Sequence, residues 1–291
     1  MEGFNVYNDI NARTNGEIYL GIVGPVRTGK STFIKRFMEM MVLPNIKDEN
    51  DREIALDEMP QSASGKTIMT TEPKFIPKTG IEIPLSNNVK AKFRLIDCVG
   101  YIVDSAQGVY EDDKERLVKT PWFDENIPFS KAAQTGTEKV IRDHSTIGIV
   151  MTTDGSIGEF TRDDYISAEE KAIMELKKIK KPFIVIVNST FPASDFTRKI
   201  ANEISEKYEV TALPMDCENL NKEDVNKILS AILYEFPIDC FNFNIPGWTE
   251  CLKNDNPVKA ELIENAADIL QKITCVKDIS KVIVTATKTS I

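Results

Sequence analysis

The sequence has few of the residues that build metal and redox sites. It contains one histidine, His144, and five cysteines, with no Cys-x-x-Cys pair among them. An odd number without metal-ligand spacing argues against a disulfide framework and against a cysteine–histidine metal centre. We therefore expect reduced, mostly buried thiols and a reducing compartment. The cysteines are Cys98, Cys217, Cys240, Cys251 and Cys275.

Long hydrophobic runs and an excess of positive charge are also missing. No apolar stretch is long enough to span a bilayer, and residues 1–20 carry scattered charges in place of a signal-peptide core. The 36 basic residues are outnumbered by 45 acidic ones, for a formal charge of −9. This balance argues against nucleic acid as a partner and against electrostatic adhesion to anionic lipid. We expect a cytoplasmic protein that meets a membrane only peripherally.

The most informative stretch is GPVRTGKS, residues 24–31, which fits the phosphate-binding loop pattern. The apolar, β-branched run EIYLGIV precedes it, and an amphipathic helical pattern follows, with Phe33, Ile34, Phe37 and Met41 on one face and Met38 as a further candidate for it. The motif therefore lies at a strand-to-helix turn, the context that phosphate binding requires. The candidate nucleotide contacts here are Gly24, Pro25, Val26, Arg27, Thr28, Gly29, Lys30, Ser31 and Thr32.

The residue types in this loop predict specific roles. Gly24 and Gly29 allow the backbone N–H groups to curl around phosphate oxygens, next to the positive end of the new helix. Lys30 is expected to reach the β- and γ-phosphates, and the Ser31 hydroxyl to ligate Mg²⁺.

A second motif follows the apolar strand candidate KAKFRLI, residues 90–96. Asp97 ends this strand, and Gly100 comes three residues later. An Asp at this position holds the Mg²⁺ shell in related nucleotide sites, and the Gly N–H meets the γ-phosphate. Asp97 is therefore a candidate catalytic and metal residue.

Between the two motifs, residues 45–66 are charged and then Ser/Gly-rich, which predicts a flexible, switch-like loop. Thr70 and Thr71 follow it, ahead of a hairpin over residues 74–97. We expect the pair to sense the γ-phosphate, with Thr71 also at the metal. The alternative is that both threonines only begin a strand.

Strands and helices alternate through the rest of the chain, which predicts an α/β fold with a mostly parallel sheet and helices on both faces. The order of strand, phosphate loop, helix, hairpin, DxxG and repeated αβ units indicates a P-loop NTPase domain of GTPase-like topology. Residues 101–136 interrupt it with a long, aromatic-rich loop that covers the site, meets a partner or forms a satellite core. His144 is expected at a helix end rather than as a catalytic base.

The character of the sequence changes near residue 238. We therefore expect a P-loop domain over residues 1–237 and the start of a second α/β domain over residues 238–291, with one long helix and a last strand at 281–291. The interrupted pattern at the end suggests a chain cut from a longer protein.

The turn that reads guanine in GTPases, Asn-Lys-x-Asp, is altered here to Asn188-Ser189-Thr190-Phe191. Without its acidic acceptor the site loses guanine discrimination, which opens it to ATP, with Asn188 kept as a contact. Tyr101 stands where many GTPases carry a water-positioning Gln, so we expect slow hydrolysis, with Arg27 and the threonine pair near the γ-phosphate.

These segments together resemble the stage IV sporulation protein A family, the ATPases that build the basement layer of the spore coat in spore-forming Firmicutes. The shared stretches are GPVRTGKSTFIKRFME, EMPQSASGKTIMTTEPKFIP, RLIDCVGY, TPWFDENIPF and HSTIGIVMTTDGSIG, and the likeness runs from residue 1 to about residue 250, as in the N-terminal part of a clostridial-type member.

The resemblance implies a translation-factor-related fold that hydrolyses ATP with Mg²⁺. It implies Lys30 as the phosphate-loop lysine, Asp97 on the Mg²⁺ side and Thr70 and Thr71 as sensors. It also implies hydrolysis-driven self-polymerisation on the mother-cell side of the outer forespore membrane. Other coat morphogenetic proteins and a small amphipathic membrane peptide would bind through a C-terminal region that this chain lacks.

Two other functions remain open on the residues alone. One is a regulatory GTPase-like switch, against which the altered base-reading turn argues. The other is a structural scaffold with a vestigial nucleotide site, against which intact Lys30, Ser31 and Asp97 argue.

Overall fold

The computed structural model describes residues 6–60, 73–86, 89–103, 110–111, 114–120, 123–238, 240–241, 247–253 and 256–279. The chain forms two compact units, residues 1–232 and 233–291, which are taken in turn.

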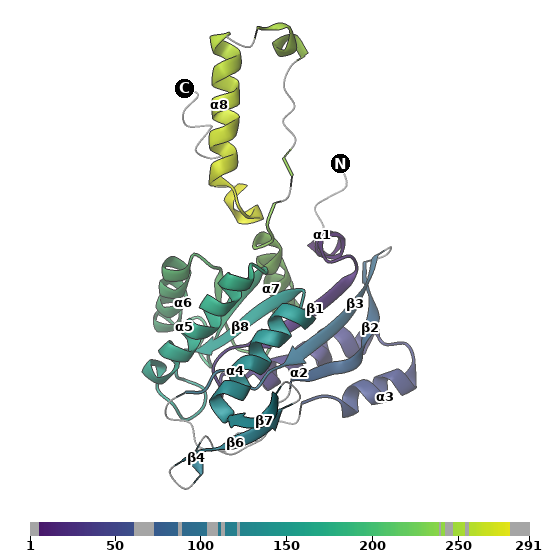
Figure 1. The fold of residues 1–291 in the computed structure, drawn as a ribbon. Helices are drawn as coiled ribbons and strands as arrows, with labels where there is room; N and C mark the ends of the chain where they lie inside the picture. The colour runs from purple at the N-terminus through teal and green to yellow at the C-terminus, as the bar shows by residue number, and fades with distance from the viewer. Residues whose placement is uncertain are drawn as a thin grey trace. The chain divides into compact units, whose positions relative to one another are not determined.

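The first unit is built on a six-stranded sheet with the strand order β10-β9-β8-β1-β3-β2 (Figure 1). Neighbouring strands run parallel except β2, which pairs with β3 in the antiparallel sense. The bounds are β1 Glu17–Val23, β2 Lys74–Ser86, β3 Val89–Asp97, β8 Ile147–Thr153, β9 Phe183–Asn188 and β10 Ala212–Met215. The predicted α/β fold with one antiparallel edge strand is thus confirmed.

Helices connect these strands. Their bounds are α1 Val6–Arg13, α2 Lys30–Phe37, α3 Glu49–Asp57, α4 Phe129–Lys139, α5 Arg162–Ile179, α6 Asp195–Tyr208 and α7 Lys222–Tyr234. Short turns of other helix types extend some of them: η1 Met38–Val42 after α2, then η2 Leu43–Asn45, and η3 Val140–His144 after α4.

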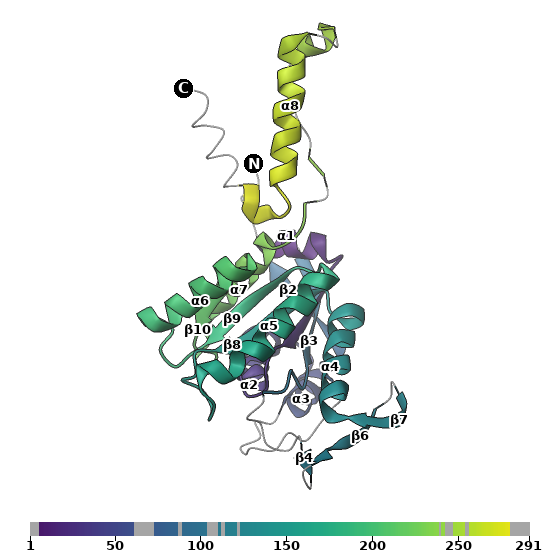
Figure 2. The same ribbon diagram turned by 60° about the vertical axis from the view of Figure 1, so that its left-hand side comes forward.

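The sheet carries helices on both faces, as the alternating pattern predicted. In Figures 1 and 2, α4 and α5 lie over one face, and α2 lies over the other. Apolar side chains of α5 and α6, such as Tyr165 and Ile204, share one buried cluster with Val150 and Val185 of the sheet. On the opposite face, the ring of Phe37 from α2 lies 6.3 Å from that of Phe93 on β3.

β8 and β9 lie in the interior of the sheet, and every residue in both is buried. Their continuous apolar sequences suit strands covered on two faces. Because these strands are parallel, their carboxyl ends meet at one edge of the sheet, where ligands bind in such folds.

Three expectations about the first unit are wrong. Residues 45–66 are not one loop, because α3 forms there: Asp48 caps it by accepting hydrogen bonds from the N–H groups of Asn50 and Asp51. Residues 61–72 lie outside the described residues. The buried apolar face of α2 continues to Val42 and not to Met41, which is half-buried. The reason is that η1 is a π-helical turn, which shifts the register of the side chains.

The third concerns the segment 101–136. It is not a single loop: it contains the short ribbons β4 Tyr110–Glu111 with β5 Lys114–Glu115 and β6 Leu117–Thr120 with β7 Phe123–Pro128 (Figure 2). Phe129 opens α4 and is fully buried, with the Arg116 guanidinium 4.4 Å from its ring centroid. His144 ends η3, as expected at a helix end, and its ring meets Phe75 edge-on.

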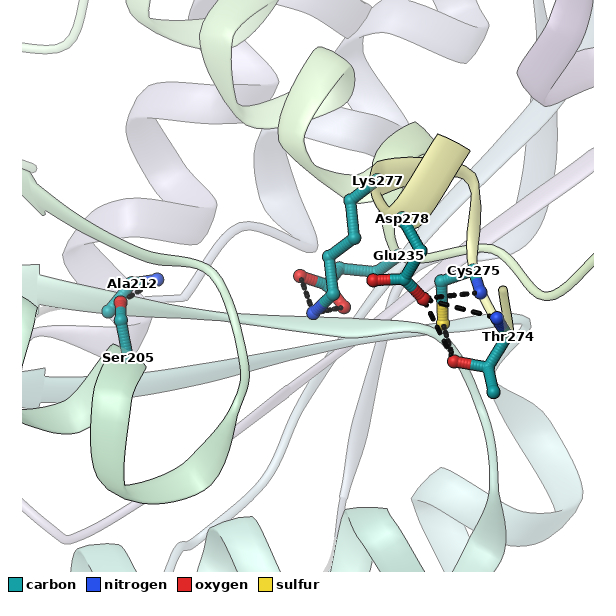
Figure 3. Close-up of polar contacts among 7 residues, drawn as sticks. All are labelled: Ser205, Ala212, Glu235, Thr274, Cys275, Lys277 and Asp278. Atoms are coloured by element: carbon teal, nitrogen blue, oxygen red, sulfur yellow. Dashed lines mark hydrogen bonds and ion pairs between the residues drawn. The ribbon is translucent and has the colours of Figure 1, made fainter. Parts of the chain in front are cut away.

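The second unit contains η4 Gly247–Cys251 and α8 Pro257–Lys272, the long helix that the sequence predicted. The strand expected over residues 281–291 lies outside the described residues. Backbone hydrogen bonds join residues 236–238 to 274–276, from Val276 N to Phe236 O and from Ile238 N to Thr274 O. Figure 3 shows the partly buried ion pair beside them, with Lys277 Nζ 2.7 Å from Glu235 Oε2.

The cysteine prediction is partly wrong. All five cysteines are free thiols, but only Cys98 and Cys217 are buried, while Cys240 and Cys251 are exposed. The exposed pair lies in the second unit, whose α8 has no buried residue. Within the described ranges, no helix is both long and apolar enough to cross a membrane.

Candidate functional site

The phosphate loop begins where β1 ends at the carboxyl edge of the sheet. Gly24 has a φ of 131° and Gly29 a φ of 86°, and Gly29 is the N-cap of α2. A β-carbon on Gly24 would lie 2.1 Å from the carbonyl oxygen of Met151 on β8. Glycine is therefore required at both positions, for the left-handed backbone and for the close approach of β8.

The DxxG segment is hydrogen-bonded to this loop. Tyr101 N donates to Gly24 O at 3.0 Å, and Val26 N donates to Tyr101 O at 2.9 Å. A β-carbon on Gly100 would lie 2.3 Å from Gly24 O and 2.6 Å from Lys30 Nζ. The two sequence motifs thus form one continuous backbone surface.

Lys30 lies at the centre of this surface. It is only 6% exposed, and its ammonium donates to Pro25 O at 2.6 Å and to Gly24 O at 3.4 Å. Burial lowers the pKa of Lys30 to about 8, although the negative charge of Asp97 opposes the shift. An ammonium held by two loop carbonyls in low-dielectric surroundings is suited to an anionic ligand.

Ser31 and Asp97 meet beside it. Ser31 Oγ donates to Asp97 Oδ2 at 2.8 Å, while no donor among the described residues reaches the buried Oδ1. Burial raises the pKa of Asp97, and the Ser31 hydroxyl and the Lys30 charge act against that shift. A serine hydroxyl and a carboxylate with one unsatisfied buried oxygen are hard oxygen ligands, which fit Mg²⁺.

The base-side turn is also tied to the loop. Asn188 ends β9, and its Nδ2 donates to Thr28 O at 3.0 Å while its Oδ1 accepts from Cys217 N at 3.0 Å. Ser189 is fully buried, and Phe191, at the position of the missing acceptor, is 70% exposed.

The structure therefore brings together the phosphate loop, Asp97, Gly100 and Asn188 at one edge of the sheet. Arg27 adopts a left-handed backbone with a φ of 65°. Tyr101, at the position of the water-positioning Gln, is 5% exposed and turned into the core cluster. Thr70 and Thr71 lie outside the described residues, so their role stays a prediction.

Sequence reasoning missed Asp154. This residue follows β8 and accepts hydrogen bonds from Ser156 N at 2.9 Å, Ser156 Oγ at 2.6 Å and Thr197 Oγ1 at 2.6 Å. Burial opposes ionisation, but the hydrogen bonds from Ser156, Ser189 and Thr197 outweigh it and lower the pKa of Asp154. The Asp-Gly-Ser turn after a buried strand was the available signal.

Two protein-family models match the chain. A family model described as "Stage IV sporulation protein A, ATPase domain" matches residues 1–237, and the corresponding "middle domain" model matches residues 238–291. A curated relative with the name Stage IV sporulation protein A, from Clostridioides difficile (strain 630), is 49% identical over 279 residues, which cover 96% of this chain and 57% of that protein.

The protein of the same name from Bacillus subtilis (strain 168) is 48% identical over 283 residues, covering 97% of this chain and 58% of that protein. The chain thus spans 57–58% of the length of these relatives.

Solved structures are more distant. A mutation variant of SsGBP aligns with a TM-score of 0.40 at 16% identity, covering 77% of this chain and 56% of that one. Translation elongation factor SelB from Methanococcus maripaludis, in complex with a GTP analogue, aligns with a TM-score of 0.40 at 14% identity, covering 76% of this chain and 35% of that one.

Motifs, fold and relatives converge on one assignment. The phosphate loop and the DxxG segment lie within the range that the ATPase-domain model matches, and the relatives named above cover nearly the whole chain at close to half identity. The chain belongs to the stage IV sporulation protein A family.

Proposed function

We propose that this chain binds and hydrolyses ATP, and that hydrolysis drives its self-assembly into the basement layer of the spore coat. The observation that carries the proposal is the cluster of Lys30, Ser31 and Asp97 under the phosphate loop. Ser31 and Asp97 are hydrogen-bonded at 2.8 Å, and Lys30 is buried against the loop carbonyls. We assign the P-loop ATPase domain to residues 1–237 and the start of the middle domain to residues 238–291.

In this proposal the loop residues Gly24 to Thr32 bind the triphosphate through the N-terminus of α2 and through the backbone N–H groups of every residue except Pro25, which has none. Lys30 exchanges its contact with Pro25 for the β- and γ-phosphates, and the Gly100 N–H serves the γ-phosphate. Ser31, Asp97 and Thr71 would hold Mg²⁺, which when bound would neutralise charge on the phosphates. Asn188 keeps the base-side turn against Thr28.

The buried Tyr101 supports slow turnover. Its backbone joins the loop, and its side chain lies in the core cluster, where it does not position a water molecule. Arg27, Thr70 and Thr71 are the remaining candidates for γ-phosphate contacts. A slow, assembly-coupled reaction suits a protein that uses each hydrolysis event for one irreversible step.

The partners we propose are further copies of the chain, other coat morphogenetic proteins and a small amphipathic membrane peptide. We place the protein on the mother-cell side of the outer forespore membrane, where it contacts the membrane only peripherally. The contacts with other proteins are assigned to the region that the longer relatives possess beyond the matched residues.

The test is an ATP hydrolysis assay in parallel with sedimentation of polymers, with the Lys30→Ala variant as control. We expect hydrolysis and sedimentation in the wild type and neither in the variant. Equal sedimentation of both proteins in the absence of ATP would support a scaffold with a vestigial site. Faster turnover of GTP than of ATP would support a GTPase-like switch.

A further inference from the structure

Phe191 combines a fixed backbone with an exposed aromatic ring. Its N–H donates to Ser189 Oγ at 2.9 Å, and its carbonyl accepts from Ser194 N at 3.0 Å. The side chain is nevertheless 70% exposed. The backbone of Phe191 is therefore fixed, while its ring contributes little buried surface to folding and is available to a ligand.

The turn that carries Phe191 is fixed relative to the phosphate loop. Asn188 Nδ2 donates to Thr28 O at 3.0 Å, and a β-carbon on Gly29 would lie 2.4 Å from that same nitrogen. Thr190 N donates to Ser156 Oγ at 3.1 Å on the other side of the turn. The turn that carries Phe191 is therefore tied to the loop that is proposed to bind the phosphates.

The carboxylate of Asp154, which is joined to this turn by hydrogen bonds, already has hydrogen-bond donors on both oxygens. Asp154 accepts two hydrogen bonds from Ser156 on Oδ1 and one from Thr197 on Oδ2. These hydrogen bonds stabilise the turn, so Asp154 has a structural role. The aromatic ring of Phe191, in contrast, is exposed to solvent.

We propose that Phe191 is a specificity-determining residue that packs against the purine base and selects adenine over guanine. This inference rests on the proposed ATP-binding function. A guanine edge carries N1–H and N2–H₂ donors, and covering them with an apolar ring leaves both groups without acceptors. At the same edge adenine has a C–H group in place of the 2-amino group, so the ring leaves only its N1 acceptor without a partner. The aromatic ring thus favours adenine directly, beyond the loss of a guanine acceptor.

The experiment measures Kd values for Mg–ATP and Mg–GTP by calorimetry on four proteins: wild type, Phe191→Ala, Phe191→Asp and Phe196→Ala. Phe196 is the matched control, because it lies at the start of α6 and is 60% exposed. We expect wild type to prefer ATP. Phe191→Ala should weaken ATP binding about fivefold, the lower end of what aromatic contacts with bases contribute, because the ring meets the edge of the base and not its face.

Phe191→Asp should strengthen GTP binding at least about tenfold and weaken ATP binding, because it supplies an acceptor to the guanine donors. Phe196→Ala should keep both Kd values within about twofold of wild type, as for a surface change away from the ligand. Circular dichroism verifies that all four proteins are folded.

The outcomes separate this inference from the proposed function. Suppose that wild type binds ATP and that both Phe191→Ala and Phe191→Asp keep the wild-type ratio of ATP to GTP affinity. The proposed role of Phe191 is then wrong, while the proposed ATP binding stands. A matching loss in Phe196→Ala would make the two rings one nonspecific surface and would also overturn the assignment. If wild type binds neither nucleotide, both proposals fall.

Discussion

The hydroxyl of Ser31 donates a hydrogen bond to Oδ2 of Asp97 at 2.8 Å, across 66 residues of sequence. It joins the first turn of α2 to the end of β3. The two residues come from separate motifs, and their contact places both candidate magnesium ligands on the same side of the phosphate loop.

Asp97→Ala should lower the rate of Mg²⁺-dependent ATP hydrolysis by on the order of 100-fold, because a metal-side carboxylate acts on the reacting phosphates. ATP affinity should fall much less, since Lys30 and the loop N–H groups are retained. Steady-state kinetics and calorimetry measure the two effects. Asp57→Ala, on the exposed end of α3, is the control; wild-type turnover in Asp97→Ala would exclude the metal role.

Lys30→Ala should weaken ATP binding about 10- to 100-fold, because hydrogen bonds from a charged donor contribute about 1.5–3 kcal/mol. The fold should be retained, since the substitution also removes a buried ammonium. Lys35→Ala on the same helix is the matched control. Unchanged ATP affinity by calorimetry in Lys30→Ala would contradict the phosphate role.

The double variant Thr70→Ala, Thr71→Ala distinguishes two roles of the threonine pair: sensing the γ-phosphate, or only beginning a strand. A sensor that contacts only the triphosphate state acts close to the transition state, so kcat should fall at nearly unchanged ATP affinity, and assembly should be lost. Single-turnover hydrolysis, calorimetry and sedimentation measure these quantities. Normal hydrolysis with a lower melting temperature would instead identify two structural threonines.

Gly100→Ala should destabilise the first unit by about 1–3 kcal/mol, because the new β-carbon would meet Gly24 O at 2.3 Å in a backbone with a φ of 92°. Nucleotide affinity should fall with it. Gly247→Ala is the control, since nothing lies within 4 Å of its added carbon. Thermal denaturation with and without ATP measures both effects, and equal melting temperatures for the two variants would refute the packing argument.

Asp154→Asn should show the pH dependence of the base-side turn. The pKa of Asp154 is lowered in the folded protein, so its charged hydrogen bonds stabilise the fold above the unfolded value of 3.8. That stability is lost as the pH falls from 3.8 through the lower folded pKa. The difference in melting temperature between wild type and variant should therefore be largest near neutral pH and shrink below about pH 4. A constant difference from neutral pH down to about pH 2.5 would contradict it.

The sequence by itself determined the local chemistry and the fold class. Gly24, Gly29 and Lys30 can be read as a phosphate loop because a β-branched strand precedes them and a helix follows, and both signals are contiguous in the chain. β8 and β9 could be predicted for the same reason, since strands buried on two faces must be apolar throughout. Asp97 and Gly100 followed from their position after the strand candidate at residues 90–96.

Tertiary structure decided what depends on distant partners. Asn188 reaches Thr28 across 160 residues, and Gly100 must be glycine because Gly24 and Lys30 press against it. Asp154 acquires its role only when Thr197 of α6 and the turn after β9 close around it. α3 forms where composition favoured a loop, because Asp48 caps it and Ala55 is buried. Local patterns carry no information about such contacts, since they arise only once the strands have assembled.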